Sequence, residues 1–264
     1  MAELNKDVLF LILNEFQDDY KSLYSCLLIN RTWCKITVPI LWKMPERYRP
    51  IKLFHVLLLL LPEESRNILK NKGIDLFKVE TYQQPLFNYI SFWKYLNLNN
   101  LEEIIIKNIG EIDVSIIIRN EILKLLINNT KLIRLSIQKE FNYQIHLISG
   151  AERCFSDLEY LHCNDTNQNI LEGLSRISKS IKKLTFDITS PYDKKNNNNF
   201  GIVKLIKNQK NLTDVIFNSL QLLSDRLHFN TLEESLIEKA NNIHYLRIEW
   251  KPVTNILSYC TNLT

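Results

Sequence analysis

The stretch Leu132-Ile133-Arg134-Leu135-Ser136-Ile137 sets a pattern that returns along the chain, with apolar residues at its first, fourth and sixth positions. Copies stand at residues 101–106, 132–137, 158–163, 181–186, 212–217 and 243–248, and they follow one another at steps of 23 to 31 residues. Helical patterns lie between them and are clearest at residues 116–127, 200–207 and 232–240. Each copy therefore predicts a short strand that is followed by a helix.

A strand and a helix that alternate at this period are typical of leucine-rich repeats. One such unit cannot bury its own apolar face, so neighbouring units have to stack into a solenoid. The predicted fold class is an α/β repeat, with an irregular leucine-rich-repeat solenoid over residues 101–264. The copies lack a strict Asn after the third apolar position. Independent short strands in an ordinary α/β domain therefore stay an alternative.

Side chains that alternate with the apolar positions are expected on the open face of the sheet. This face has charges of both signs and contains Tyr and Arg, which are frequent at binding hot spots. We expect it to bind a protein, and an ordinary solvated sheet face is the alternative. The outward positions are Glu103, Ile105, Lys107, Arg134, Ser136, Gln138, Tyr160, His162, Asn164, Lys183, Thr185, Asp187, Asp214, Ile216, Asn218, Tyr245, Arg247 and Glu249. The residues expected to carry the binding are Arg134, Tyr160, His162, Lys183, Asp214, Tyr245 and Arg247.

The last residues, Cys260-Thr261-Asn262-Leu263, resemble the onset of a seventh strand. A solenoid that ends within a repeat leaves an apolar edge uncovered. Three interpretations stay open: a fragment, a truncated gene product, or an edge that a partner covers.

The first forty residues predict three short helices. Asn5 is a good N-cap because its side-chain oxygen can accept a backbone N–H of the first turn, and apolar residues follow at helical spacing as far as Phe16. Residues 17–19 (Gln-Asp-Asp) form a polar break, and an aspartate there can cap a second, leucine-rich helix that is apolar on more than one side. A third helix begins after Asn30 and is expected to end at residues 37–39, where Pro39 stands.

Four segments of this stretch match a known module: residues 4–7 (Leu-Asn-Lys-Asp), the leucine-rich run 23–28, residues 29–33 (Ile-Asn-Arg-Thr-Trp), and Leu41-Trp42. With them the chain resembles an F-box over residues 1–43. Asn5 stands where the family usually has Pro, and capping by Asn can start a helix in its place. Residues 22–34, 38–42 and 86–92 are similar to a large, expanded fungal F-box family.

The resemblance implies docking onto the Skp-type adaptor of a cullin ubiquitin ligase. The chain would be a non-catalytic substrate receptor with an unidentified protein substrate on its repeats; a scaffold that acts without ubiquitylation is the alternative. The module also holds more large apolar side chains than it can bury, which marks an interface. Packing of the module onto the C-terminal part of its own chain would also explain that surplus. The residues expected to contact the adaptor are Leu4, Val8, Leu9, Leu23, Leu27, Ile40 and Trp42.

Residues 44–100 are expected to form a linker and a helical cap for the solenoid. Residues 44–50 are basic and bounded by prolines, which predicts an extended linker. Apolar residues 51–61 and residues 63–71 predict two helices separated by Pro62, with Gly73 as a left-handed cap. The aromatic run 85–93 is expected to pack in the core rather than to form a ligand site.

Composition and motifs exclude several functions. A net charge of +4 without a dense basic patch argues against nucleic acid, although RNA or a small hormone on the repeats is a third hypothesis. Five cysteines without metal spacing, and no signal segment, indicate a reducing compartment, the cytoplasm or the nucleus. The apolar run 51–61 is too short for a bilayer. Without a phosphate-binding, zinc-protease or nucleophile motif, we expect no cofactor, no metal site and no catalysis.

Overall fold

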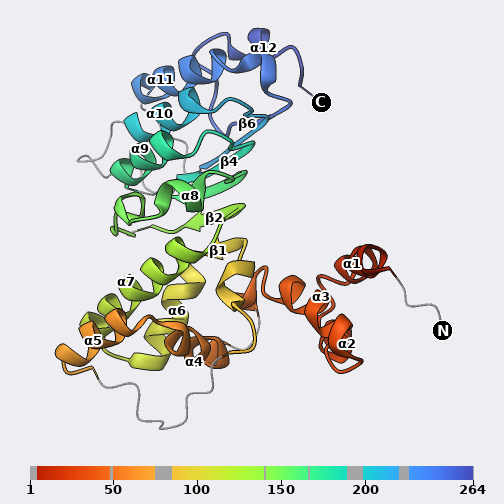
Figure 1. Ribbon diagram of the computed structural model, residues 1–264. Helices are drawn as coiled ribbons and strands as arrows, with labels where there is room; N and C mark the ends of the chain where they lie inside the picture. Colours follow the sequence, from red (N-terminus) through yellow and green to blue (C-terminus); the bar gives the residue numbers. More distant parts are fainter. Residues whose placement is uncertain are drawn as a thin grey trace. The chain divides into compact units, whose positions relative to one another are not determined.

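A computed structural model of the chain describes residues 5–47, 50–74, 85–139, 141–165, 167–188, 199–219 and 226–263 (Figure 1). The chain divides into two compact units. The first consists of residues 1–95 and 104–130, and the second of residues 96–103 and 131–264.

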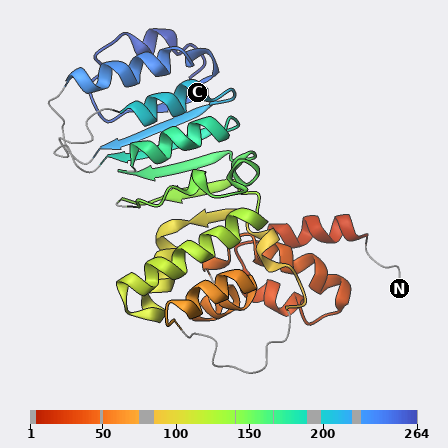
Figure 2. The same cartoon turned by 60° about the vertical axis from the view of Figure 1, so that its left-hand side comes forward.

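The second unit contains a sheet whose strands follow one another in chain order (Figures 1 and 2). The strands are β1 (Tyr95–Asn97), β2 (Arg134–Ile137), β3 (Tyr160–Asn164), β4 (Lys183–Ile188), β5 (Asp214–Ser219) and β6 (Tyr245–Arg247). From β2 to β6 each strand pairs in parallel with the next. Helical segments connect them, so the expected α/β architecture is confirmed as parallel strands that alternate with helices in one sheet, consistent with leucine-rich-repeat-like units.

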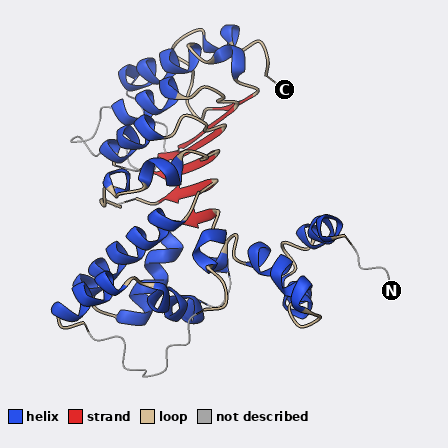
Figure 3. Cartoon of the chain, viewed as in Figure 1, coloured by secondary structure: helices blue, strands red, loops and turns tan. Residues whose placement is uncertain are grey.

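The longer helices of this unit line one face of the sheet (Figures 1 and 3). They are α8 (Ala151–Phe155), α9 (Gln168–Ile177), α10 (Phe200–Asn208) and α11 (Arg226–Ile237), and α12 (Ile256–Tyr259) follows the last strand. Short 3-10 turns η3 (Ile145–Leu147) and η4 (Ala240–Asn242) complete the connections. The helices predicted at residues 200–207 and 232–240 are thus confirmed, the second with a shift of its boundaries. Residues 260–263, the expected onset of a seventh strand, form no strand.

The strands are in register, so equivalent core residues form straight columns. In one column Leu135, Leu161, Leu184, Val215 and Leu246 are successive partners, and the first four are buried. A second column ends with a stacked aromatic pair, whose ring centroids are 5.1 Å apart. That column is Ile137, Cys163, Phe186 and Phe217. The predicted strands from the second copy of the pattern onward are therefore confirmed.

The first predicted strand, at residues 101–106, is wrong, because these residues belong to helix α6 (Leu98–Ile109). A strand would bury Ile106 and expose Ile105, whereas Ile105 is 1% exposed and Ile106 is 48% exposed. The Asn97 side chain accepts the backbone N–H groups of Asn99 and Asn100, at 3.0 and 3.3 Å, and starts the helix directly after β1. The expected outward positions Glu103, Ile105 and Lys107 therefore lie on a helix.

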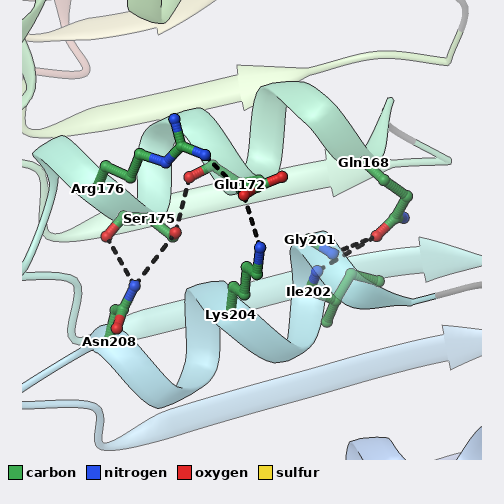
Figure 4. A network of polar contacts seen from close by, with 8 residues as sticks. All are labelled: Gln168, Glu172, Ser175, Arg176, Gly201, Ile202, Lys204 and Asn208. Atoms are coloured by element: carbon green, nitrogen blue, oxygen red, sulfur yellow. Dashed lines mark hydrogen bonds and ion pairs between the residues drawn. The ribbon is translucent and has the colours of Figure 1, made fainter.

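Helices α9 and α10 approach closely at the start of α10 (Figure 4). Gln168 Oε1 accepts the backbone N–H groups of Gly201 and Ile202, at 2.9 and 3.3 Å. A side chain of the preceding repeat therefore caps α10. A Cβ atom on Gly201 would lie 2.3 Å from the Gln168 carbonyl oxygen, so this approach requires glycine.

Two further contacts join α9 and α10 along their length (Figure 4). Glu172 Oε1 lies 2.6 Å from Lys204 Nζ and 2.7 Å from Arg176 Nη2. These hydrogen bonds hold the pKa of the Glu172 carboxyl below its ordinary value. At the far end Asn208 donates to the backbone oxygen and to the hydroxyl of Ser175, at 3.2 and 3.3 Å.

The first unit begins with three helices, α1 (Lys6–Glu15), α2 (Tyr20–Cys26) and α3 (Arg31–Leu41). The predicted caps of the first two helices are confirmed, because Asn5 Oδ1 accepts the N–H of Asp7 and Asp19 accepts that of Ser22. The side chain of Asn30 caps the third helix in the same way and accepts the N–H of Trp33. The predicted end of the third helix is wrong, because α3 continues through Pro39 to Leu41. Pro39 lacks a backbone N–H and its ring crowds the preceding turn, but burial of Ile40 and Leu41 in the core of the module favours the last turn.

The rest of this unit contains α4 (Pro50–Leu60), α5 (Glu63–Asn71), η2 (Tyr89–Phe92), α7 (Ile112–Asn129) and the end of α6. Gly73 has a φ of +74°, so the predicted left-handed cap after α5 is confirmed. Ile90 and Trp93 are buried, as expected for core packing of the aromatic run. The expected extended linker is wrong at Pro45–Arg47, which forms the 3-10 turn η1, and residues 48–49 lie outside the described residues.

Candidate interaction surfaces

Most of the predicted adaptor-binding residues lie inside the N-terminal helices rather than on their surface. Leu9, Leu23 and Ile40 are 2%, 0% and 5% exposed and form the core of the module together with Leu13 and Leu41. Their side chains are therefore not available at the surface of this structure, and the expectation of direct contact is corrected for these three. The core is where large apolar side chains from three short helices converge.

The remaining predicted residues occupy three kinds of position. Leu27 and Trp42 are half-buried and pack against the core of the module. Trp42 also lies against Tyr89, with ring centroids 4.5 Å apart, and burial, with a smaller contribution from the Cys34 thiol, raises the pKa of Tyr89. Val8 is exposed. Leu4 lies outside the described residues.

A different set of apolar side chains is exposed on the same helices. Leu28 is 87% exposed in the turn after α2, and Leu11 is 64% exposed on α1. Val8, Leu11 and Ile12 are spaced by three and four residues, so they share one face of α1. The sequence interpretation missed all of this set except Val8. The exposed set, which we call the apolar surface of the module, is Val8, Phe10, Leu11, Ile12, Phe16, Tyr20, Tyr24, Leu28 and Ile29.

The strands bring most of the predicted binding residues of the repeats into one row. Arg134, Tyr160, Lys183, Asp214 and Tyr245 are successive register partners from β2 to β6. Arg134 Cζ and Lys183 Nζ lie 5.8 and 5.9 Å from the centroid of the Tyr160 ring. Cations at this distance are attracted to the face of an aromatic ring.

A second row runs beside the first and contains Ser136, His162, Thr185, Ile216 and Arg247. Arg247 pairs with Glu249 at 2.5 Å, at the β6 edge of the sheet. Thr185 is buried, unlike the exposed position expected for it. The sheet thus places all seven predicted binding residues of the repeats in two adjacent rows.

A chain of hydrogen bonds crosses three strands on this face. Ser136 Oγ lies 3.1 Å from His162 Nδ1, and His162 Nε2 lies 2.7 Å from Asp187 Oδ2. Asn218 donates to the other carboxylate oxygen of Asp187 at 2.7 Å. Both ring nitrogens of His162 therefore have a partner, which fixes the orientation of the ring.

The order serine, histidine, aspartate resembles that of a hydrolytic triad, but the surroundings differ. Ser136 contacts the Nδ1 atom of His162 and Asp187 contacts Nε2, which is the reverse of the usual arrangement. Backbone N–H groups of neighbouring parallel strands are engaged in the ladder, so those of β3 and β4 are not free to stabilise an oxyanion. The hydrogen bonds instead hold Ser136, His162 and Asp187 in fixed positions on the open face, where they can contact a bound partner.

Two polar atoms on this face are buried without a hydrogen-bond partner among the described residues, Asn164 Oδ1 and Thr185 Oγ1. Leaving a buried polar atom unsatisfied costs about 1–3 kcal/mol. Unsatisfied atoms of this kind are few in folded proteins and need a reason. Among the described residues two more such atoms, His146 Nδ1 and Ser178 Oγ, lie outside the strands, so this feature does not set the open face apart.

Within the described ranges, no three His, Cys, Asp or Glu side chains are grouped to hold a metal ion. His162 is half-buried on the open face and Cys163 is buried in the core, so these neighbours point to opposite sides of the sheet. None of the helices in the described part of the chain combines the length and the apolar character that a membrane-spanning segment requires. Comparison of the chain with protein-family models, curated proteins and solved structures found no match.

Proposed function

We propose that this chain is the substrate-receptor subunit of a Skp–cullin–F-box ubiquitin ligase. In this function the three N-terminal helices bind a Skp-type adaptor, and the open face of the repeats binds a protein substrate. The proposal rests on the F-box resemblance of residues 1–43 and on the repeats that follow.

The observation that carries the proposal furthest is the apolar surface of the module. Large apolar side chains on both α1 and the turn after α2 face solvent, although the module already has an apolar core. Several large exposed apolar side chains on so small a module favour a protein interface. Leu11 and Leu28 are the most exposed apolar side chains of this surface and are therefore the proposed anchors.

The proposed mechanism is proximity. A receptor that holds its substrate near the ubiquitin-carrying E2 enzyme raises the effective concentration of the substrate lysines. No group of this chain needs to react in such a mechanism. Cys26 and Cys34 in the module and the buried Cys154, Cys163 and Cys260 need no catalytic role.

Capture of a purified Skp-type adaptor by the full chain tests the docking surface. We expect the double variant Leu11→Asp/Leu28→Asp to weaken capture by about tenfold or more, because hot-spot truncations cost about 2 kcal/mol or more. Leu27 and Trp42 are poorer choices for this test, because they pack on the core and their replacement also weakens folding.

Leu147→Asp is the matched control, since Leu147 is an exposed apolar residue of the repeats, at 74%. It should leave capture unchanged, and circular dichroism of every variant should match the wild type. Equal recovery of adaptor by the wild type and the double variant would show that this surface is not the dock. Recovery of adaptor without cullin in a reconstituted mixture would favour a scaffold that acts without ubiquitylation.

A further inference from the structure

The imidazole ring of His146, on η3, lies directly against the middle of α9. A Cβ atom on Gly173 would lie 2.2 Å from Cγ and 2.3 Å from Nδ1 of this ring. Glycine inside a helix is less favourable than alanine, so it needs a reason at this position. The close approach of the ring supplies that reason, because any larger residue at position 173 would displace the ring.

The surroundings of this ring suit the neutral form of the imidazole. Its Nδ1 atom is buried and has no hydrogen-bond partner among the residues that the structure describes. A neutral ring can carry its proton on Nε2, which leaves on Nδ1 only an unused acceptor. A charged ring carries protons on both nitrogens, so its Nδ1–H would be buried without an acceptor. The second arrangement costs more, because a charged group loses more by burial than a neutral one.

The charged groups of α9 act on the ring in opposite directions. Burial lowers the pKa of His146, the Arg176 guanidinium lowers it further, and the Glu172 carboxylate acts against both and is outweighed. Glu172 is already paired with Lys204 and Arg176, at 2.6 and 2.7 Å (Figure 4). These two cations reduce the attraction that its carboxylate exerts on a charged imidazole.

Helix α8 also packs against η3. Its charged residues are Glu152 and Arg153, which are adjacent, exposed and of opposite sign. Their charges offset one another at a distance, and solvent screens both. The balance at the ring is therefore set by its burial and by α9.

We propose that the contact between His146 and Gly173 is a pH-sensitive switch, which holds η3 against α9 while the ring is neutral and releases it when the ring takes up a proton. Helix α9 connects β3 to β4, so its release loosens the helix layer behind two strands of the open face. The switch does not depend on the proposed function.

The direction of the pH dependence follows from the pKa shift. Folding lowers the pKa of His146, so the released state binds the proton more tightly than the closed state. The contact therefore has its full stability above about pH 6.5, the ordinary pKa of His, and weakens as the pH falls below it. One proton can change the opening equilibrium by at most about tenfold for each pH unit. The carboxyl groups with lowered pKa, Glu172 and Glu233, lose their contributions only below about pH 4.5.

Hydrogen exchange of the full chain at about pH 7.5 and about pH 5, corrected for the intrinsic effect of pH on exchange, tests the switch. At the lower pH we expect the protection of η3 and α9 in the wild type to fall several-fold. His146→Phe keeps a flat ring against Gly173 and removes the titrating group, so its protection should be equal at the two pH values. In an NMR titration of the wild type, the ring of His146 should have its midpoint below about pH 6.5.

His244→Phe is the matched control, because it removes an exposed histidine of the same unit. It should keep the pH response of the wild type. Gly173→Ala should displace the ring and lower the protection of η3 already at the higher pH, to the level of the wild type at the lower pH.

An equal pH response in the wild type and His146→Phe would overturn the proposal. So would a midpoint of the His146 titration at or above the ordinary value of about 6.5, a result that needs no variant to fold. Unchanged protection of η3 in Gly173→Ala would show that the ring does not hold the contact, and would overturn it as well.

Discussion

Glu233 on α11 is a fully buried carboxylate that holds the segment after β6. Its oxygens accept the indole N–H of Trp250 at 2.8 Å and the backbone N–H groups of Val253 and Thr254, at 3.1 and 2.7 Å. Trp250 in turn stacks on Phe229, with ring centroids 4.4 Å apart. Burial acts to raise the pKa of Glu233, but the hydrogen bonds from Thr254, Trp250 and Val253 outweigh it and lower the pKa.

We expect Glu233→Gln to lower the free energy of unfolding by about 2 kcal/mol, because charged acceptors make the strongest of these hydrogen bonds. A carboxyl whose pKa is lowered by folding stabilises the protein above its unfolded pKa, and this contribution is lost as the pH falls. Below about pH 4.5, near the ordinary pKa of Glu, the wild type should therefore lose stability more steeply than the variant. Urea unfolding at several pH values measures both effects.

Glu234→Gln is the control for this prediction, because the neighbouring carboxylate is exposed. It should leave both the free energy of unfolding and its pH profile close to those of the wild type. Identical pH profiles for the wild type and Glu233→Gln would show that the carboxylate does not hold the segment.

At the scale of elements, the helices of adjacent repeats are joined by side chains that end one helix and begin the next. Gln168 lies at the first position of α9, and its amide oxygen caps α10 through Gly201 and Ile202. The hydrogen bonds connect residues more than thirty positions apart, so they contribute to the interface between repeats rather than to either helix alone.

We expect Gln168→Ala to cost about 1 kcal/mol of unfolding free energy, the usual effect of removing a helix cap. Asn169→Ala removes an exposed amide at the next position of the same helix and should cost less. Thermal unfolding followed by circular dichroism gives the comparison. An equal loss of stability in the two variants would mean that Gln168 contributes through the intrinsic preference of α9 rather than through the cap.

The elements also show what sequence patterns can and cannot predict here. The later strands were predictable because their apolar alternation is followed by helical patterns. Residues 101–106 fit the same pattern, but Leu98, Leu101, Ile104 and Ile105 fit a helix equally well, and all four are buried in α6. Strand β1 has three residues, too few for a periodicity to show. The cap at Asn97 was the available signal.

A similar limit applies to the apolar surface of the module. The surplus of apolar side chains was predictable from composition, because three short helices enclose little volume. Which side chains face inward was not predictable, because α1 has apolar residues around most of its circumference. Packing against α2 and α3 decides that Leu9 and Leu13 are buried while Leu11 is exposed. In the strands of the repeats the inward positions can be predicted, because successive side chains of a strand point to opposite faces of the sheet.

At the scale of the whole molecule, the chain has two compact units, each with its own core. The core of the N-terminal helices centres on Leu9, Leu13 and Leu23, and the core of the repeats consists of the strand columns. Units with separate cores can unfold independently, each with its own free energy of unfolding.

We therefore expect a substitution in one unit to act locally. Asn30→Ala removes the cap of α3, which accepts the Trp33 N–H at 3.0 Å, and should speed hydrogen exchange in residues 5–47 by a factor that corresponds to about 1 kcal/mol. Protection of β3 to β5 should be unchanged. Glu233→Gln should instead speed hydrogen exchange in the second unit and leave residues 5–47 unchanged. Hydrogen exchange measured by mass spectrometry compares the two variants. Faster exchange throughout both units in either variant would show that they unfold as one.

The columns of core residues through β2 to β6 also bear on how chains of this kind diverge. The ladder bonds and the inward side chains, from Leu135 to Val215, determine the backbone without help from the outward rows. Substitutions at surface positions away from such packing usually change stability by less than about 0.5 kcal/mol. Duplicated copies of the gene could therefore change Arg134, Tyr160 or Lys183 one at a time and acquire new ligands, while every intermediate still folds.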